Sequence, residues 1–252
     1  MEFKPGERVD EVNDKLSLIQ NGEGLTFGTD ALLLAGYVTG KHARALELGS
    51  GSGIISMLLI TREKASYIDA VEVQKSYAEL TSRNAEFNGL SDRLTAVCSD
   101  IRDYRTEKEY DCVFTNPPYM KATSGKMNVS EKKAIARHEL AGDIYDFCSC
   151  AARLLKFGGS FFAVFRPDRL TDLTSAMRRA KIEPKRMTFV HADSVSAPSM
   201  VLVEGKRGGK CGLKVTRPLL IYKDKPHVLY TEDMDYIMKT GNFPDDFGVK
   251  IG

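Results

Sequence analysis

The sequence predicts an α/β fold in which a doubly wound, mostly parallel sheet of seven strands carries helices on both faces. Two observations predict it. Apolar runs of strand length recur along the 252 residues, and segments of helical length separate them. Several runs are continuous in valine, isoleucine, leucine and phenylalanine rather than alternating with polar residues, which is typical of parallel strands that are buried on both faces.

The expected elements follow from these runs. Strands are expected at residues 43–48, 67–73, 94–98, 110–114, 160–165, 186–190 and 200–204, and helices at 53–63, 74–88, 143–155 and 168–180. Phe157-Gly158-Gly159 follows the third helix, where a glycine is placed as a C-cap. Before the first core strand, residues 16–20 and 25–27 are expected to form a hairpin about Asn21-Gly22, followed by a helix at 29–38.

Composition limits the class of protein. No segment approaches the apolar length of a membrane span and the N-terminus is polar, so we expect a soluble, cytoplasmic protein. The five cysteines include no Cys-x-x-Cys pair, which indicates neither a disulfide framework nor a metal site. We expect a catalytic core at residues 41–205, a small N-terminal extension at 1–40, and a basic loop with a peripheral segment at 206–252.

A glycine-rich turn joins the first core strand to the next helix. Its sequence is Gly49-Ser50-Gly51-Ser52-Gly53. Glycines allow a ligand to approach the backbone, and the amides at a helix N-terminus can face a polar group. A tight turn with no ligand is the alternative. Dinucleotide-binding folds need a further glycine where this chain has Ile54, so NAD binding is disfavoured.

Two acids follow at the ends of the next two strands. Glu72 lies about 20 residues beyond the glycines, where an acid can accept hydrogen bonds from ribose hydroxyls. Asp100 follows the third core strand, and its carboxylate could accept an adenine amino group while Ile101 packs on the ring. The alternatives are a solvated surface glutamate and a turn cap. The three features together predict a crevice for a nucleoside-like ligand.

The fourth core strand leads into Asn116-Pro117-Pro118-Tyr119. Two prolines cannot continue a parallel strand, so the chain must turn out at the carboxyl edge of the sheet, where such folds bind ligands. The Asn116 side-chain oxygen and the Pro117 carbonyl can accept both N–H groups of a conjugated amine, and Tyr119 can stack on a planar target. A tight turn is again the alternative.

These features resemble motifs of the class I S-adenosylmethionine-dependent methyltransferases. The resemblance implies that the glycine turn holds the methionine moiety, Glu72 the ribose and Asp100 the adenine, and that S-adenosylhomocysteine is released. The tetrapeptide matches the signature of enzymes that methylate adenine N6, guanine N2 or glutamine N5, with Asn116, Pro117 and Tyr119 as catalytic residues. The implied cofactor contacts are Thr29, Asp30, Glu47, Gly49, Ser50, Gly51, Gly53, Glu72, Val73, Asp100, Ile101 and Asn116.

The whole chain resembles the bacterial tRNA (adenine-N6)-methyltransferases that modify the purine beside the anticodon of a valine tRNA. The likeness is carried by Ile19-Gln20, by Phe27-Gly28-Thr29-Asp30 with the helix after it, by Ala136-Arg137-His138-Glu139 and by Gly212-Leu213-Lys214-Val215; Thr216-Arg217-Pro218 departs from it. It implies that residues 1–40 cover the cofactor and that Thr29 or Asp30 contacts its methionine end, an N-cap being the alternative. His138 is assigned no catalytic role.

The resemblance implies methylation of adenine N6 in a tRNA anticodon loop. Glutamine-N5 methylation of a protein, guanine-N2 methylation of ribosomal RNA and a non-catalytic, cofactor-binding RNA chaperone are the alternatives. A net charge of +2 does not by itself indicate nucleic-acid binding. Lys121 and the later Lys206, Arg207 and Lys210 are expected to track RNA phosphates, the alternative being a solvated surface. The sequence does not predict an oligomeric state.

Overall fold

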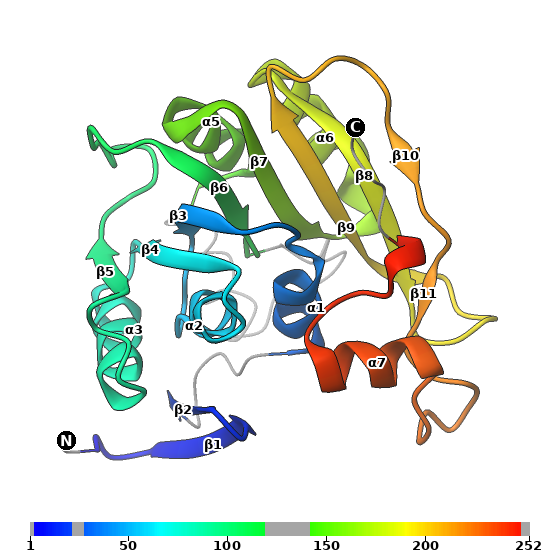
Figure 1. Cartoon of the computed structure of the whole chain (residues 1–252), viewed down its shortest axis with the longest axis horizontal. Helices are drawn as coiled ribbons and strands as arrows, with labels where there is room; N and C mark the ends of the chain where they lie inside the picture. The colour runs from blue at the N-terminus through cyan, green and yellow to red at the C-terminus, as the bar shows by residue number, and fades with distance from the viewer. Residues whose placement is uncertain (1–2, 22–27, 119–141, 248–252) are drawn as a thin grey trace, which may run out of the picture.

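The computed structural model of the chain describes residues 3–21, 28–118 and 142–247. In this part of the chain one sheet of nine strands has the order β10-β8-β9-β7-β6-β3-β4-β5, with β11 beside β8 (Figure 1). The strands are β3 (His42–Leu48), β4 (Ala65–Glu72), β5 (Leu94–Cys98), β6 (Tyr110–Thr115), β7 (Leu155–Phe165), β8 (Ile182–His191), β9 (Pro198–Arg207), β10 (Lys214–Val215) and β11 (Leu219–Leu220).

The sheet is parallel except at β9. β3, β4, β5, β6 and β7 pair in parallel, and so do β10 and β11 with β8, while β9 is antiparallel to both β7 and β8. A short turn joins β8 to β9 and allows only an antiparallel neighbour. The predicted doubly wound, mostly parallel sheet is confirmed. The seven predicted strands are all present, and the tail adds two short ones that the sequence did not predict.

Helices cover both faces of the sheet, as Figure 1 shows. The helices are α1 (Thr29–Tyr37), α2 (Ile54–Thr61), α3 (Lys75–Phe87), α5 (Ile144–Leu154), α6 (Leu170–Arg179) and α7 (Glu232–Thr240), with 3-10 turns at Pro167–Arg169 and Asp245–Phe247. None of the helices in the described ranges has the length and apolar character needed to cross a membrane.

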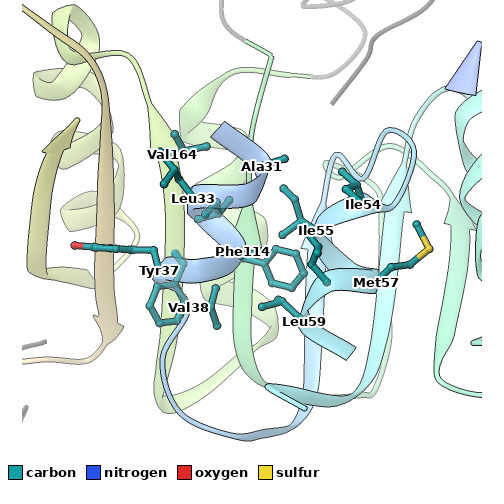
Figure 2. Packing of buried hydrophobic residues seen from close by; sticks show 14 of the residues in the cluster. Ala31, Leu33, Tyr37, Val38, Ile54, Ile55, Met57, Leu59, Phe114 and Val164 are labelled. Atoms are coloured by element: carbon teal, nitrogen blue, oxygen red, sulfur yellow. The ribbon is translucent and has the colours of Figure 1, made fainter. Parts of the chain in front are cut away.

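Alternate residues of the central strands enter two separate hydrophobic clusters. Phe162 and Val164 of β7 pack with α1 and α2, whereas Phe161 and Ala163 of the same strand pack with α5 and α6. Figure 2 shows the first cluster, in which Phe114 and Val164 meet side chains of α1 and α2. Alternation along a strand therefore gives one apolar surface to each helical layer.

The junction between α5 and β7 differs from the predicted one. The helix ends at Leu154, its C-cap Leu155 is extended, and β7 begins at once. Phe157-Gly158-Gly159 is part of β7 and caps no helix. Gly158 has φ of 77°, and the pairing register shifts between Tyr110 and Cys112 on the neighbouring strand, so the glycine permits a bulge.

The N-terminal hairpin also differs from the predicted one. β2 (Leu16–Asn21) pairs antiparallel with β1 (Glu7–Asn13), while residues 25–27 lie outside the described residues. The turn between the strands is short, and the Asn13 side chain accepts a hydrogen bond from the Lys15 amide at 2.9 Å. β1 was missed because its residues are mostly polar and exposed, which gives it no apolar signature.

Two asparagines, Asn84 in α3 and Asn88 at its C-cap, bind the free edge of this hairpin. The Asn84 amide accepts from the Ile19 N–H at 2.7 Å and donates to the Ile19 carbonyl at 3.1 Å. The Asn88 amide makes the same pair of bonds with Ser17, at 3.0 and 2.8 Å. Residues four apart on a helix share a face, and residues two apart on a strand share an edge. The two side-chain amides therefore bond to the free backbone groups of β2, as a neighbouring strand would.

Two buried cations hold the C-terminus of α1. Lys64 Nζ donates to the carbonyls of Ala35, Gly36 and Val38 at 2.8–2.9 Å, and burial lowers the pKa of Lys64 to about 7. Arg186 donates to the Tyr37 carbonyl at 2.8 Å and lies 3.9 Å from the centroid of the Tyr37 ring. Positive charge is favourable beside the carbonyl end of a helix. The helix is thus fixed against β8 and the end of α2.

Replacing Asn84 by alanine should destabilise the protein. The side chain is fully buried, and its removal leaves the two Ile19 backbone groups and the Ser52 carbonyl without their partner. We expect the free energy of unfolding in urea to fall by on the order of 3 kcal/mol. Ser82→Ala on the exposed face of α3 is the control and should change it little. Equal unfolding curves for Asn84→Ala and the wild type would contradict this account.

Candidate functional site

The carboxyl ends of four parallel strands bring the predicted site together. β3 ends at the glycine turn, β4 at Glu72, β5 just before Asp100, and β6 at Asn116. Thr115 Oγ1 donates to the Leu48 carbonyl at 2.7 Å, which fixes the ends of β6 and β3 to each other. The predicted cofactor residues and Asn116 therefore share one edge of the sheet, the edge where open α/β sheets bind ligands.

The glycines of the turn have two different tasks. Gly49, Gly51 and Gly53 all have positive φ, of 75°, 55° and 80°. A Cβ on Gly53 would lie 2.7 Å from Thr81 Cγ2, so this glycine allows α3 to pack closely. A Cβ on Gly51 would meet no described atom within 4 Å. The space that a side chain of Gly51 would occupy is therefore open.

Two side chains of α3 support this turn from behind, and sequence reasoning missed both. Thr81 Oγ1 donates to the Gly51 carbonyl at 2.9 Å, and Asn84 Nδ2 donates to the Ser52 carbonyl at 3.0 Å. Both side chains are fully buried. The signal in the sequence was a threonine and an asparagine three residues apart on a helix, at positions that face the core.

Glu72 is fixed beside the turn. Its two carboxylate oxygens accept the Gly51 and Gln74 amides, each at 3.0 Å, and the residue is 6% exposed. Each oxygen of a carboxylate has two lone pairs, so both can accept a further hydrogen bond. A contact of this carboxylate with ribose hydroxyls stays a prediction. Val73, which follows, is half-buried.

Glu47 lies beneath the turn and faces α2. The Ser56 hydroxyl donates to its carboxyl group, and the residue is 1% exposed. Burial raises the pKa of Glu47 to about 8, although the hydrogen bonds from Ser56 act in the opposite direction. Its position indicates that it supports the turn from within the core.

Asp100 caps its own turn. Its carboxylate accepts the backbone amide of Arg102 at 2.8 Å and is paired with the Arg102 guanidinium, which holds the pKa of Asp100 below its usual range. Ile101 is 4% exposed and belongs to the cluster beneath α5. The structure therefore places the Ile101 side chain in the core, and an adenine contact by Asp100 stays a prediction.

Asn116 is oriented by an acid from another element. Its Nδ2 donates to Asp30 Oδ2 at 2.8 Å, and Asp30 Oδ1 accepts the Ala31 amide at 3.0 Å. Asp30 lies in the first turn of α1, whose N-cap is Gly28, so neither Asp30 nor Thr29 is the N-cap. Because the amide nitrogen faces Asp30, the amide oxygen faces the other way. Pro117 is buried, while Tyr119, Lys121 and His138 lie outside the described residues.

The late basic residues lie at the other edge of the sheet. Lys206 pairs with Ser160 in the middle of β7, and its Nζ donates to the Gly158 carbonyl at 3.3 Å. Arg207 donates to the Leu155 carbonyl, and Lys210 follows in the loop. The structure does not bring these residues to Asn116. Their contact with RNA stays a prediction.

Comparison with known proteins now identifies the family. Residues 22–179 match the model of the methyltransferase small domain. The chain belongs to the methyltransferase small domain family. The matched range contains α1, the glycine turn, Glu72, Asp100 and the tetrapeptide that begins at Asn116, which together form the edge described above.

Relatives and solved structures agree with this placement of the methyltransferase. A tRNA1(Val) (adenine(37)-N6)-methyltransferase of Pedobacter heparinus is 34% identical over 176 residues, which are 69% of this chain and 74% of the relative. One from a Flavobacteriaceae bacterium is 25% identical over 91% of this chain and 95% of its own. The structure of a predicted O-methyltransferase from Agrobacterium tumefaciens has a TM-score of 0.69 at 22% identity, covering 85% of this chain and 98% of that one, which shows the shared fold.

Glu47→Gln should remove one source of pH dependence from stability. A carboxyl group whose pKa is about 8 in the folded chain, against an ordinary 4.5, is bound to its proton more tightly when folded. The stability that it contributes is full below pH 4.5 and is lost as the pH rises through 8. Over this interval the free energy of unfolding of the wild type in urea, measured relative to that of Glu47→Gln, should fall as the pH rises. Parallel profiles for the two proteins would sink the idea.

Proposed function

We propose that this methyltransferase transfers a methyl group from S-adenosylmethionine to the exocyclic N6 amine of an adenine in a tRNA anticodon loop. The observation that carries the proposal is the Asn116 amide, held by Asp30 beside the open glycine turn. The printed names of the relatives supply the substrate class. Their agreement on one substrate favours it over glutamine-N5 or guanine-N2 methylation and over a chaperone without catalysis.

The edge of the sheet has the groups that such a cofactor requires. Gly51 leaves room in front of the turn, Glu72 offers acceptors to ribose hydroxyls, and Asp100 lies at the next strand end. Asp30 and Thr29 begin α1 beside Asn116. When bound there, S-adenosylmethionine supplies an electrophilic methyl group on a sulfonium and is converted to S-adenosylhomocysteine.

Asn116 and Pro117 would activate the amine. The lone pair of a conjugated amino nitrogen is delocalised, which makes the nitrogen a poor nucleophile. Hydrogen bonds from its two N–H groups to the Asn116 oxygen and the Pro117 carbonyl orient it and localise that lone pair. Held in this way, the amine would be placed for in-line attack on the methyl group that bound S-adenosylmethionine would supply, and the proton lost from its nitrogen would pass to water. In this step Tyr119 would stack on the base.

Asp30 would act through Asn116. By accepting from Nδ2, it selects the orientation in which the amide oxygen is the acceptor that an amine needs. An amide rotated by half a turn would place its NH2 group against the N–H groups of the amine, and two donors cannot form a hydrogen bond.

The contacts proposed for RNA phosphates come from Lys121, Lys206, Arg207 and Lys210, of which Lys210 is exposed on its loop.

Asn116→Ala should abolish most turnover and leave cofactor binding largely intact. We expect kcat to fall on the order of a hundredfold or more, as when a single preorganised catalytic hydrogen bond is removed. Asp30→Ala should lower kcat less, by about tenfold, because the Asn116 amide stays present and loses only the group that orients it. Asp92→Ala on an exposed turn is the matched control. Full activity of Asn116→Ala would refute the proposed role.

The substrate is identified directly by product analysis. Purified protein, methyl-labelled S-adenosylmethionine and total tRNA from cells that lack the enzyme are incubated, and the RNA is digested to nucleosides for mass spectrometry. We expect label in N6-methyladenosine, absent with Asn116→Ala. Label in N2-methylguanosine would show that the target is guanine N2 and not adenine N6, with the same chemistry. Label in protein alone would exclude RNA as the substrate.

A further inference from the structure

One half of the carboxyl edge is not used by the cofactor site. The strand order places β3, β4 and β5 on one side of β6, and β7, β9 and β8 on the other. The glycine turn, Glu72 and Asp100 all lie on the first side. In Figure 1 the turn between β8 and β9 and the loop before α7 lie on the right, away from β5 and α3 on the left. A large substrate that reaches Asn116 can therefore contact the second half of the edge, at the ends of β7, β9 and β8.

A short hairpin extends from that half. Residues 222–230, called the aromatic hairpin here, follow β11, which pairs with Val190 and His191 at the end of β8. Tyr222 and Tyr230 form an antiparallel bridge, and the Lys223 amide donates to the Leu229 carbonyl at 3.0 Å. The Tyr222 amide donates to the Ala192 carbonyl at 2.8 Å, so the hairpin begins at the carboxyl edge.

The aromatic hairpin is fixed by a buried acid in the turn between β8 and β9. His227 Nε2 lies 2.7 Å from Asp193 Oδ2, and the His227 ring stacks on Tyr222, which in turn stacks on Tyr230. Asp193 is 1% exposed and also accepts the Val195 and Ser196 amides, at 3.0 and 2.7 Å. The loop is thereby ordered before any partner binds, which lowers the entropic cost of binding.

The surface that the Asp193–His227 contact holds in place is apolar and aromatic, and two lysines flank it. Val228 is 73% exposed, Leu229 61% and Tyr230 36%, and Val195 of the neighbouring turn is 82% exposed. Lys223 and Lys225 are exposed, and neither forms an ion pair with a described residue. Three carboxylates lie close to these two lysines: Asp224 in the hairpin, and the exposed Glu232 and Asp235 in the first turn of α7. Adjacent exposed apolar side chains of this kind mark an interaction site.

We propose that the aromatic hairpin docks the single-stranded RNA loop that carries the target adenine. Unstacked bases of such a loop pack on aromatic and apolar side chains, and lysines meet the phosphates between them. The combination of Tyr230, Val228 and Leu229 with Lys223 and Lys225 offers both contacts. His227 and Asp193 act as positioning residues. This inference rests on the proposed function and adds the surface by which that function selects its substrate.

The test separates RNA docking from chemistry. In Tyr230→Ala with Leu229→Ala we expect KM for tRNA to rise about tenfold, the loss expected for about one stacked base, with kcat and cofactor affinity unchanged. In Lys223→Gln with Lys225→Gln, the slope of log affinity against log salt should fall by about 2. Matched controls are Tyr236→Ala, an exposed tyrosine of α7, and Lys41→Gln with Lys239→Gln, and all should give wild-type values.

The positioning role has its own readout. Asp193→Asn should raise KM for tRNA and lower the protease resistance of the aromatic hairpin, while kcat stays unchanged. An unchanged KM would show that RNA binding does not need the Asp193–His227 contact. Wild-type KM in both hairpin variants, with tRNA still methylated by the wild type, would overturn the inference and leave the proposed function standing. Failure of the wild type to bind or methylate RNA would end both. A dimer in light scattering that the hairpin variants dissociate would assign the surface to a second copy instead.

Discussion

The site depends on the hydrogen bonds that two buried cations, Lys64 and Arg186, donate to the C-terminus of α1. Lys64 and Arg186 together take four carbonyl oxygens at the C-terminus of this helix. Taking a cation out of water is costly, and the cost is offset here by well-aligned acceptors and by the negative end of the helix dipole. The opposite end of the same nine-residue helix carries Asp30. A rigid helix that is fixed at one end delivers the acid at its other end to Asn116.

The same cations join distant parts of the chain. Lys64 also donates to the Gly241 carbonyl at the end of α7, and Arg186 is paired with Glu204 of β9 at 2.9 Å and donates to the Phe247 carbonyl. Phe243 and Phe247 pack in the cluster that contains α1 and α2. The N-terminal and C-terminal segments that the sequence separated from a core at 41–205 thus share one hydrophobic cluster with that core. Whether they behave as separate units stays a prediction.

What could be predicted from the sequence was carried by short local patterns. Continuous apolar runs revealed the parallel strands, and the glycine turn and the tetrapeptide at Asn116 revealed the edge where they end. Features that depend on a distant partner could not be predicted in this way. The Asp30–Asn116 hydrogen bond spans 86 residues, and the Asn84–Ile19 bonds span 65. Polar β1 and two-residue β10 are strands only because a neighbour pairs with them, so their own residues carry no periodic signal.

Asn84 also couples the ordering of the glycine turn to the docking of the N-terminal hairpin. One amide group bonds to Ile19 of β2 and to Ser52 of the turn, so the ordering of either segment places the amide correctly for the other. By linkage, a ligand that stabilises the turn also stabilises the docked hairpin. The free energy that ligand binding adds to docking equals the free energy that docking adds to ligand binding. The amide protons of β2 would then exchange more slowly in the loaded protein, although they lie outside the binding edge.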